Sequence, residues 1–418
     1  MKPRVVVTGM GVVSPFGYLE TDEYWNGIVK GTPNFREITM FPLTAKHKTR
    51  IAGEVDGFPA EKYISSELRK RIGKLGVPNG GRSIYYGLRA CQMALEDSGL
   101  DLDNEDKDRI GIFTGTLRGD NSLISEGSPS LTWTFYSIPG SLTSCIVAEN
   151  NIQNCSFGIS SAACATGNVN IEMAYDNIVF GKIDCGIAGS SSAHLSVPHP
   201  FDDLSGRISP MSRSTDTYPM KPFDVRRDGF IISEGSGMLI IEELGHAQKR
   251  NAKIYAEVLG CGSVLSVSGH FADVSRDGYS AAMTKALYNS GISDSDLQKK
   301  EVYVCSHGTA TQKNSIEESH AVEKVFDGNC CRPFVSSIKG SLGHSQEASS
   351  AQESVASVYV LNRNIIPVTG GLEEVDPECA NLNYVMSNSI EQEVDLVLNN
   401  AAGFGGIYST IVFGKYRE

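Results

Sequence analysis

Short apolar runs rich in β-branched residues alternate with segments of helical spacing along most of this chain. The expected strands are 4–8, 109–114, 184–189, 237–242 and 254–264, and the expected helices are 21–31, 63–74, 83–98, 170–179, 244–249 and 280–291. After residue 300 the alternation begins again, with strands at 301–305, 334–338, 394–398 and 408–413 and helices at 316–326 and 348–361. Continuous apolar runs are typical of buried strands, and this order of elements predicts two α/β layers of similar plan.

Composition excludes several classes of protein. The chain has 418 residues, of which 40% are hydrophobic and 21% charged, as is typical of a globular protein. Its formal net charge of −12 argues against a nucleic-acid-binding protein. We find no signal peptide and no apolar run of about 18 residues that could cross a bilayer. We therefore expect a cytoplasmic protein with neither a nucleic acid nor a membrane as partner.

Ten cysteines are scattered along the chain, and none of them forms a C-x-x-C pair. A chain of this length does not need disulfide bonds to stabilise a core. We expect reduced thiols.

The segment Gly9-Met10-Gly11 follows the first expected strand and invites comparison with a dinucleotide-binding motif. The third glycine of that motif is missing, and Ser14-Pro15 interrupts the position where its helix would begin. We therefore interpret the two glycines as a tight turn after a core strand.

Cys164 stands among small residues, in Ser160-Ser-Ala-Ala-Cys-Ala-Thr-Gly167, just before an expected helix. Small neighbours let a substrate approach the sulfur, and the positive end of a helix dipole favours a thiolate. These features suit a nucleophile that forms a thioester. The alternative is a small buried hydrophobic residue, which is the usual role of a free cysteine.

Three later segments place polar residues among glycines directly after an expected strand. They are His307-Gly-Thr-Ala-Thr311, Lys339-Gly-Ser-Leu-Gly-His344 and Gly403-Phe-Gly-Gly406. Histidine is suited to proton transfer or hydrogen-bond donation near neutral pH, and loops at strand ends are where α/β proteins collect such groups. The other histidines, which we interpret as background, are His47, His194, His199, His246, His270 and His320.

One cysteine at a small-residue helix start, two histidines, a lysine and a Gly-Phe-Gly-Gly loop, in this order, resemble the β-ketoacyl synthases. The resemblance runs from Val5 to Phe413. It implies the thiolase-like α/β fold, with two αβαβα halves related by a pseudo-twofold axis around a five-layer core. The halves would span 1–250, which carries Cys164 and cap insertions, and 251–418, which carries the histidines, the lysine and the glycine loop. Two such chains would pair along a sheet edge.

The resemblance also implies a role for each residue of the motifs. Cys164 would take up an acyl chain as a thioester, and His307 and His344 would bind a malonyl thioester and favour its decarboxylation. Lys339 would form an ion pair with Glu353 and keep the two histidines oriented. The enolate would then attack the acyl chain on the cysteine. The resemblance implies no metal and no other cofactor. Both substrates would be delivered on the phosphopantetheine of an acyl carrier protein.

Further motif positions are supporting ones. The backbone N–H groups of Cys164 and Phe404 would form the oxyanion hole. Phe404 would also gate the acyl pocket, and Thr309 and Thr311 would bind the phosphopantetheine arm. The remaining supporting positions are Gly403, Gly405 and Gly406.

The finer assignment rests on Gly403-Phe-Gly-Gly-Ile-Tyr-Ser-Thr410, which lacks the Thr-Asn found in fatty-acid elongating enzymes. The segment resembles the ketosynthase subunit of type II polyketide synthases, which pairs as a heterodimer with a chain-length-factor homologue. The first alternative is a homodimeric enzyme of fatty-acid elongation. The second is a non-catalytic chain-length-factor-type subunit, which the presence of Cys164 disfavours. A degradative thiolase is disfavoured because Cys379 lies in an Asp-Pro-Glu turn and not in a glycine loop.

Two segments depart from the family pattern. Ser345-Gln-Glu-Ala-Ser-Ser350 replaces a run of small apolar residues, and we expect partners or a polar substrate for these side chains, because burying them unpaired is costly. Ser315 replaces a common aspartate, so the local hydrogen bonding must differ.

The densest basic cluster of this acidic protein could dock an acidic carrier protein, although a solvated helix face is an equally good interpretation. The cluster comprises Lys62, Arg69, Lys70, Arg71 and Lys74; the first four of these, together with Arg207 and Arg213, are the candidate docking residues.

Overall fold

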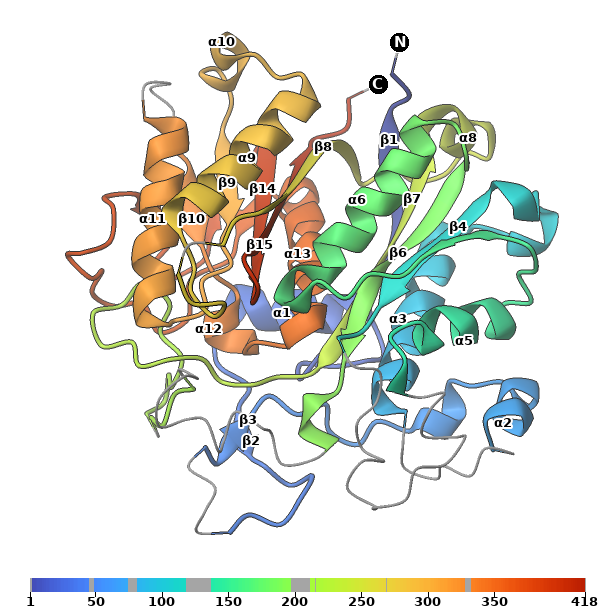
Figure 1. The fold of residues 1–418 in the computed structure, drawn as a ribbon, viewed down its shortest axis with the longest axis horizontal. Coiled ribbons are helices and arrows are strands. Elements are labelled where there is room, and N and C mark those ends of the chain that lie inside the picture. Colours follow the sequence, from blue (N-terminus) through green and yellow to red (C-terminus); the bar gives the residue numbers. More distant parts are fainter. Residues whose placement is uncertain are drawn as a thin grey trace.

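The computed structural model describes residues 2–44, 49–73, 81–117, 137–196, 211–214, 216–267, 269–327 and 332–417. Within these ranges, eleven strands form one mixed sheet in the order β12-β10-β9-β14-β15-β8-β1-β7-β6-β4-β5 (Figure 1). The strands of its first half are β1 (Val5–Val13), β4 (Ile110–Gly115), β5 (Ser156–Gly158), β6 (Cys185–Ser192) and β7 (Gly235–Glu243). Those of its second half are β8 (Ala256–Leu265), β9 (Val302–Cys305), β10 (Phe334–Ser336), β12 (Asn383–Tyr384), β14 (Leu396–Gly403) and β15 (Ile407–Gly414).

The two halves of the sheet have the same topology. From the outside inward, the first half runs β5-β4-β6-β7-β1 and the second runs β10-β9-β14-β15-β8, so these strands correspond in chain order; β12, outside β10, has no counterpart among the described strands. The innermost strands, β1 and β8, pair antiparallel, with Val5 opposite Val258. This repeated order is the expected thiolase-like fold with a pseudo-twofold relation. The boundary near residue 250 stays a prediction, although it falls between the two sets of strands.

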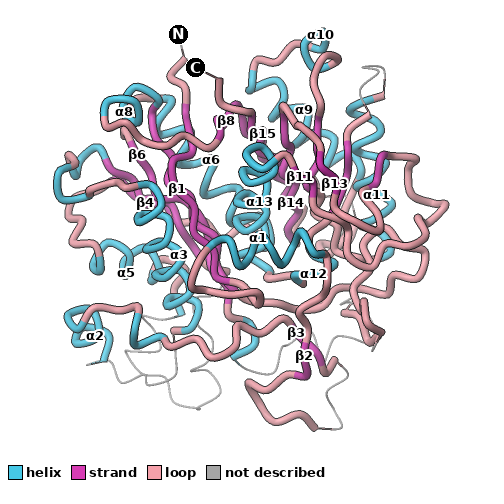
Figure 2. Tube along the Cα trace, turned by 180° about the vertical axis from the view of Figure 1, so that it is seen from behind, coloured by secondary structure: helices cyan, strands magenta, loops and turns pink. Residues whose placement is uncertain are grey.

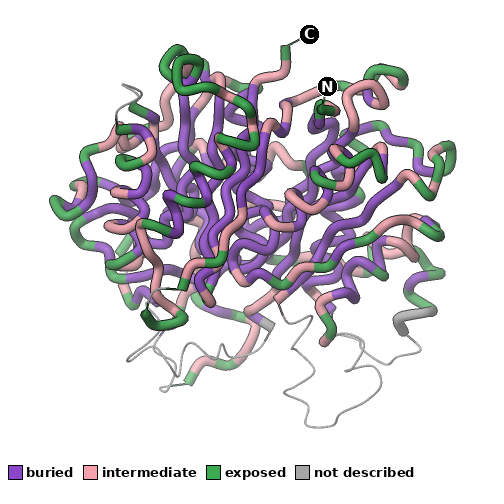
Figure 3. The backbone as a smooth tube through the Cα atoms, turned by 45° about the horizontal axis from the view of Figure 1, so that its top comes forward, coloured by how far each residue is buried: buried purple, intermediate pink, exposed green. Residues whose placement is uncertain are grey.

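Helices form the remaining layers. Helices α6 (Thr166–Val179) and α13 (Ser349–Arg363) lie between the two halves of the sheet, as Figure 1 shows. Helices α3 (Arg82–Ser98) and α5 (Ser141–Glu149) pack on the outer face of the first half, and α9 (Arg276–Ser290) and α11 (Gln312–Phe326) cover that of the second. The buried residues concentrate in the strands, the two central helices and α3, whereas α9 and α11 mix buried and exposed residues (Figure 3).

Shorter elements surround this core. They are α1 (Thr21–Lys30), β2 (Arg36–Glu37), β3 (Ile51–Ala52), α2 (Ser66–Gly73), α8 (Leu244–Lys249), α10 (Asp294–Leu297), α12 (Lys339–Leu342), β11 (Ile365–Ile366) and β13 (Ile390–Glu391). Figure 2 shows α1 beside α12 and both chain ends at one end of the molecule. There Arg4 donates to the backbone oxygen of Arg417 at 3.1 Å.

The interpretation of Gly9 and Gly11 as a tight turn is wrong. Both glycines lie inside β1, which continues to Val13. A Cβ atom added at Gly9 would lie 2.2 Å from the backbone oxygen of Ala94, and one at Gly11 would lie 2.0 Å from that of Ala90. Glycine is needed here because α3 packs its backbone directly on the strand.

Most expected elements are present, but some bounds differ. The helix expected at 63–74 begins at Ser66, after a single 3₁₀ turn over Ala60–Lys62. The region 117–158, expected to be irregular, contains α5 and β5 in its described part. Helix α9 begins four residues early because the side chain of Ser275 caps it by accepting from the N–H of Gly278.

The structure also bears on the thiols, on membrane spans and on metal binding. Of the described residues, eight are cysteines with free thiols. No helix in the described ranges is long and apolar enough to cross a membrane. No group of three or more histidine, cysteine, aspartate or glutamate side chains among the described residues could hold a metal ion.

Candidate active site

Cys164 lies in a single 3₁₀ turn, Ala163–Ala165, directly before α6, so the expected position at a helix start is confirmed. Ala163 has a left-handed φ of 48°, which is costly for a residue with a Cβ atom. Thr166 fastens the turn, because its hydroxyl accepts from the N–H of Ala162 at 3.0 Å and donates to the oxygen of Ala163 at 2.7 Å. The strained backbone presents the sulfur in the space between the two central helices and the glycine loop.

Burial opposes the Cys164 thiolate that the helix start is expected to favour, and that expectation stays a prediction. The side chain is buried, and burial raises the pKa of the thiol to about 12. The Lys339 ammonium lowers this pKa in part, while the carboxylates of Glu347 and Glu353 raise it. Desolvation of the thiolate therefore acts against the partial positive charge of the helix N-terminus. Cys164 therefore rests as a thiol that must lose its proton during acyl transfer.

The two predicted histidines meet edge to face beside the cysteine turn. Their ring centroids are 5.4 Å apart and the rings are inclined by 86°. His307 follows β9, and His344 follows α12, where its backbone N–H donates to Ile231 at 2.8 Å. Burial, the Lys339 ammonium and the neighbouring histidines hold the pKa of both rings well below the usual value. Both are neutral imidazoles, each able to offer one N–H to a substrate oxygen.

A serine holds the ring of His344 in place. Ser349 Oγ lies 2.7 Å from His344 Nδ1 and 3.3 Å from Ser345 Oγ, whose own proton is donated to Gln352 at 2.6 Å. Because Nδ1 is engaged by Ser349, Nε2 is the ring nitrogen left to face a substrate.

Lys339 connects the His307 loop with Glu353 on helix α13. It is 1% exposed and forms an ion pair with Glu353, which is equally buried. Its Nζ also donates to the backbone oxygen of His307 at 2.7 Å and lies 3.5 Å from the Nδ1 of that ring. Burial raises the pKa of Glu353 to about 7, against the attraction of Lys339. The structure thus brings together the pair that the resemblance implied, next to His307.

Glu318 on α11 is a site residue that our reading of the sequence missed. Its carboxylate accepts from the backbone N–H of His307 at 2.7 Å and from that of Gly308 at 2.9 Å. Asn314 donates to the same carboxylate at 3.1 Å. A signal existed, because Glu318 shares the apolar face of its helix with Ala321 and Val322, where a charged residue needs partners.

The glycine loop Phe404–Gly406 connects β14 to β15 and covers the cysteine turn. A Cβ atom added at Gly403 would lie 2.6 Å from the oxygen of Ala162 and 3.4 Å from the nitrogen of Cys164. Gly405 and Gly406 have φ values of 89° and 79°, which favour glycine. The Phe404 side chain is 41% exposed, at the mouth of the site. Its assignment as gate and as an oxyanion-hole donor stays a prediction.

The threonines and Ser315 lie on the chain between β9 and α11. Thr309, which is buried, and Thr311, which is half-buried, contact each other through their hydroxyls at 3.2 Å. Ser315 is fully buried, and its hydroxyl accepts from the N–H of Phe223 at 3.3 Å. Because Phe223 has a left-handed φ of 63°, Ser315 supports a strained backbone in place of the usual aspartate.

The polar run after His344 does have partners, as expected, with one exception. Glu347 accepts from the N–H of Leu117 at 3.1 Å and pairs with His194 Nε2 at 2.7 Å, so His194 is not the background residue that we expected. Burial opposes ionisation of Glu347, but His194 and these hydrogen bonds lower its pKa. Ser350 accepts from the N–H of Asn168 at 3.1 Å. The exception is the Nε2 of Gln346, which has no hydrogen-bond partner among the described residues.

Only some of the candidate docking residues lie on a common surface. Lys62, Arg69 and Lys70 are exposed on and before α2, and Arg213 is exposed elsewhere in the chain. Only the backbone of Arg71 is described, and Arg207 lies outside the described residues, as do His47 and His199.

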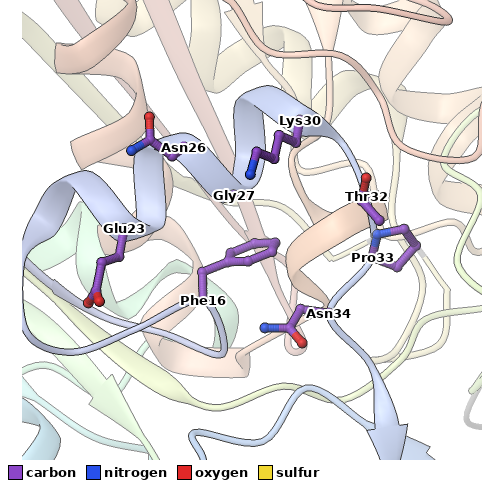
Figure 4. Close-up of a pocket in the computed structure, with 8 residues that line it drawn as sticks. All are labelled: Phe16, Glu23, Asn26, Gly27, Lys30, Thr32, Pro33 and Asn34. Carbon is purple, nitrogen blue, oxygen red and sulfur yellow. The ribbon is translucent and has the colours of Figure 1, made fainter.

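Two other candidates lie apart from the site. Cys379 packs in the apolar cluster that contains Phe223 and Tyr279, so it is not a second cysteine of the site. A surface hollow beside α1, lined by Phe16, Glu23, Lys30 and Asn34, holds none of the predicted catalytic residues (Figure 4). Two of its polar side chains already have partners: Glu23 accepts from the N–H of Leu19, and Asn34 donates to the oxygen of Pro15.

Known proteins resemble this chain over its length. Residues 2–247 match the family model of the β-ketoacyl synthase N-terminal domain, and residues 255–373 match that of the C-terminal domain. A putative polyketide β-ketoacyl synthase of Streptomyces halstedii is 32% identical, over 99% of this chain and 98% of that protein. The 3-oxoacyl-(acyl-carrier-protein) synthase 2 of Synechocystis sp. is 31% identical, over 100% and 99%. A solved structure of the ishigamide ketosynthase/chain length factor has a TM-score of 0.87 and 29% identity, with both chains fully covered.

Proposed function

The chain belongs to the β-ketoacyl synthase family of condensing acyltransferases, and from this premise we propose that it elongates acyl chains by decarboxylative Claisen condensation in a type II polyketide pathway. The observation that carries the proposal is that Cys164, in a strained turn, lies within the electrostatic reach of Lys339, which bonds to His307, and that His307 meets His344 edge to face at 5.4 Å. The roles given to individual residues below are part of the proposal.

The first step is acyl transfer. Cys164 Sγ forms a bond to the carbonyl carbon of an acyl thioester, the carbon–sulfur bond to the carrier breaks, and the thiol proton passes to the departing thiolate. The N–H groups of Cys164 and Phe404 stabilise the oxyanion. Thr309 and Thr311 hold the arm that delivers the thioester.

The second step is condensation. His307 and His344 donate hydrogen bonds to the thioester carbonyl oxygen of a malonyl unit, which stabilises the enolate formed when carbon dioxide leaves. A neutral imidazole can do this because one of its two ring nitrogens carries an N–H. The enolate carbon then attacks the acyl carbon, and Cys164 leaves as a thiolate. No step requires a metal or a redox group.

The polyketide assignment is favoured over fatty-acid elongation by the polar run beside the cysteine. Gln346 and the Glu347–His194 pair are buried there, where a fully reduced chain would meet unpaired or charged groups. The similarity to the relatives from Streptomyces and Synechocystis, at 32% and 31% identity, does not separate the two functions. Fatty-acid elongation therefore remains the alternative.

The proposed partners are an acyl carrier protein and a chain-length-factor homologue. The Synechocystis relative is named for a carrier-protein substrate, and the ishigamide structure pairs a ketosynthase with a chain length factor. A homodimer is the alternative. Expression alone and together with a chain-length-factor homologue from the same genome separates the two, because an active homodimer would contradict the heterodimer. A cytoplasmic location stays a prediction.

The experiment that tests the reaction combines the protein with acyl and malonyl carrier proteins and follows both products. We expect carbon dioxide and a β-ketoacyl carrier protein in equal amounts. Acyl exchange without release of carbon dioxide would contradict a condensing role.

A further inference from the structure

Gln346 is the one residue of the polar run whose side chain is only half satisfied. It is 4% exposed, and its Oε1 accepts a long hydrogen bond from the Cys164 thiol at 3.9 Å. Its Nε2 is buried and has no hydrogen-bond partner within the described chain. A buried amide donor without a partner is unfavourable, and such groups in a site point to a ligand that supplies the missing acceptor.

The backbone holds this side chain in place. Gln346 has a left-handed φ of 52° at the start of a 3₁₀ turn, Gln346–Ala348. The next residue, Glu347, is fixed by Leu117 and His194, and the preceding residue, Ser345, is fixed by Gln352. The amide is therefore directed at the cysteine by a strained and well-anchored segment, which is typical of functional positions.

Acylation removes the hydrogen bond that Gln346 has in the resting site. The Sγ–H proton leaves when the thioester forms, and a thioester sulfur cannot donate. Oε1 then loses its donor while Nε2 still lacks an acceptor. A fully reduced acyl chain leaves both ends of the amide unpaired, whereas a chain with an oxygen near the thioester can pair with it.

We propose that Gln346 is a specificity-determining residue that binds an oxygen at C3 of the acyl chain on Cys164. The oxygen is a carbonyl or a hydroxyl that accepts from Nε2, and a hydroxyl can also donate to Oε1. The C1 oxygen is already assigned to the oxyanion hole, so C3 is the first oxygenated carbon that a group beside Sγ can reach. The inference rests on the proposed function and adds the chemical class of the acyl chain.

The test measures loading of Cys164 by intact mass, with butanoyl, 3-hydroxybutanoyl and 3-oxobutanoyl thioesters of N-acetylcysteamine. In each reaction, Cys164 Sγ bonds to the acyl carbon and N-acetylcysteamine leaves with the proton. The variants are Gln346→Leu, which removes the amide, and Gln346→Asn, which keeps it on a shorter side chain that tolerates the left-handed backbone. Gln298→Leu, an exposed exchange of the same kind, is the matched control.

For each protein, the loading rate of an oxygenated chain is divided by the loading rate of butanoyl. The ratio for the variant is then divided by the ratio for wild type, which gives a double ratio. This double ratio cancels the intrinsic reactivity of the thioesters. We expect Gln346→Leu to lower it about tenfold, or about 1.4 kcal/mol. Gln346→Asn should lower it less, and Gln298→Leu should not change it. If Gln346→Leu does not fold, Gln346→Met serves as the second apolar variant.

Two results would overturn the inference. One is an unchanged double ratio in Gln346→Leu. The other is a variant that loads all three chains as wild type does but condenses malonyl units more slowly, which would assign Gln346 to the extender unit. Failure of wild type to load any of the three chains would instead contradict the proposed function itself.

Discussion

Lys339 Nζ donates to the backbone carbonyl oxygen of His307 at 2.7 Å, and it does so from a position that is 1% exposed. One ammonium therefore connects the ion pair with Glu353 to the loop that carries the first histidine. The arrangement makes Lys339 a positioning residue as well as a structural charge. Its two roles can be separated by mutation.

Removal of Lys339 should affect stability and activity differently. Lys339→Met leaves the Glu353 carboxylate buried and unpaired, which costs about 3–5 kcal/mol. The double variant Lys339→Met with Glu353→Gln removes the stranded charge and should regain most of that stability, as measured by urea unfolding. Malonyl decarboxylation should stay low in both, because His307 has lost its anchor. A double variant as active as wild type would show that the lysine is only structural.

Glu318 should position His307 through its backbone N–H, as Lys339 does through its backbone oxygen. Glu318→Gln keeps one carbonyl acceptor for the N–H groups of His307 and Gly308 but turns an N–H₂ group toward the other. We expect a loss of about 1–3 kcal/mol in unfolding free energy and a fall in kcat of about tenfold, with KM for the acyl donor little changed. Steady-state kinetics at fixed malonyl carrier protein measure the split. An effect on stability alone would contradict a positioning role.

The raised pKa of Cys164 predicts its reactivity with pH. Alkylation requires the thiolate, and with a pKa of about 12 the thiolate fraction rises as pH rises. The rate of modification by iodoacetamide should therefore increase about tenfold per pH unit between pH 7 and pH 10, without a plateau. Lys339→Met should slow the reaction at every pH, because the ammonium lowers this pKa. Peptide mass spectrometry locates the label. A plateau below pH 8 would contradict the assignment.

The basic cluster offers a test of carrier-protein docking. Reversal of charge at Lys62, Arg69 and Lys70, which are all exposed, should raise KM for the carrier-protein substrate several-fold and weaken the dependence of turnover on salt. Lys299→Glu, on another exposed surface, is the control. Unchanged KM and unchanged salt dependence would favour the alternative of a solvated helix face.

Much of the fold follows from local pattern, because buried strands and amphipathic helices leave clear periodicities. Gly99 and Gly291 end their helices with φ values of 62° and 72°, as helix-terminal glycines should. The role of Gly9 and Gly11 could not be read locally, because it depends on how closely α3 packs on β1. The length of β1 was underestimated for the same reason.

Part of the candidate site could likewise be predicted from the sequence, and part could not. Cys164, His307, Lys339 and His344 belong to recognisable motifs, and the structure brings them together. Glu318 and His194 act through contacts that are remote in sequence, with the backbone of His307 and with Glu347. The pKa of Cys164 could not be foreseen either, since it depends on how completely the folded chain excludes water from the sulfur.

The measurement that tests the account most directly is acyl loading of Cys164. Wild type incubated with an acyl thioester should gain the mass of one acyl group per chain, on the peptide that contains Cys164. Cys164→Ala, in which His307, His344 and Lys339 are unchanged, should gain none. An acyl group retained in this variant, or found in wild type on another residue, would contradict the assignment of Cys164 as the residue that carries the growing chain.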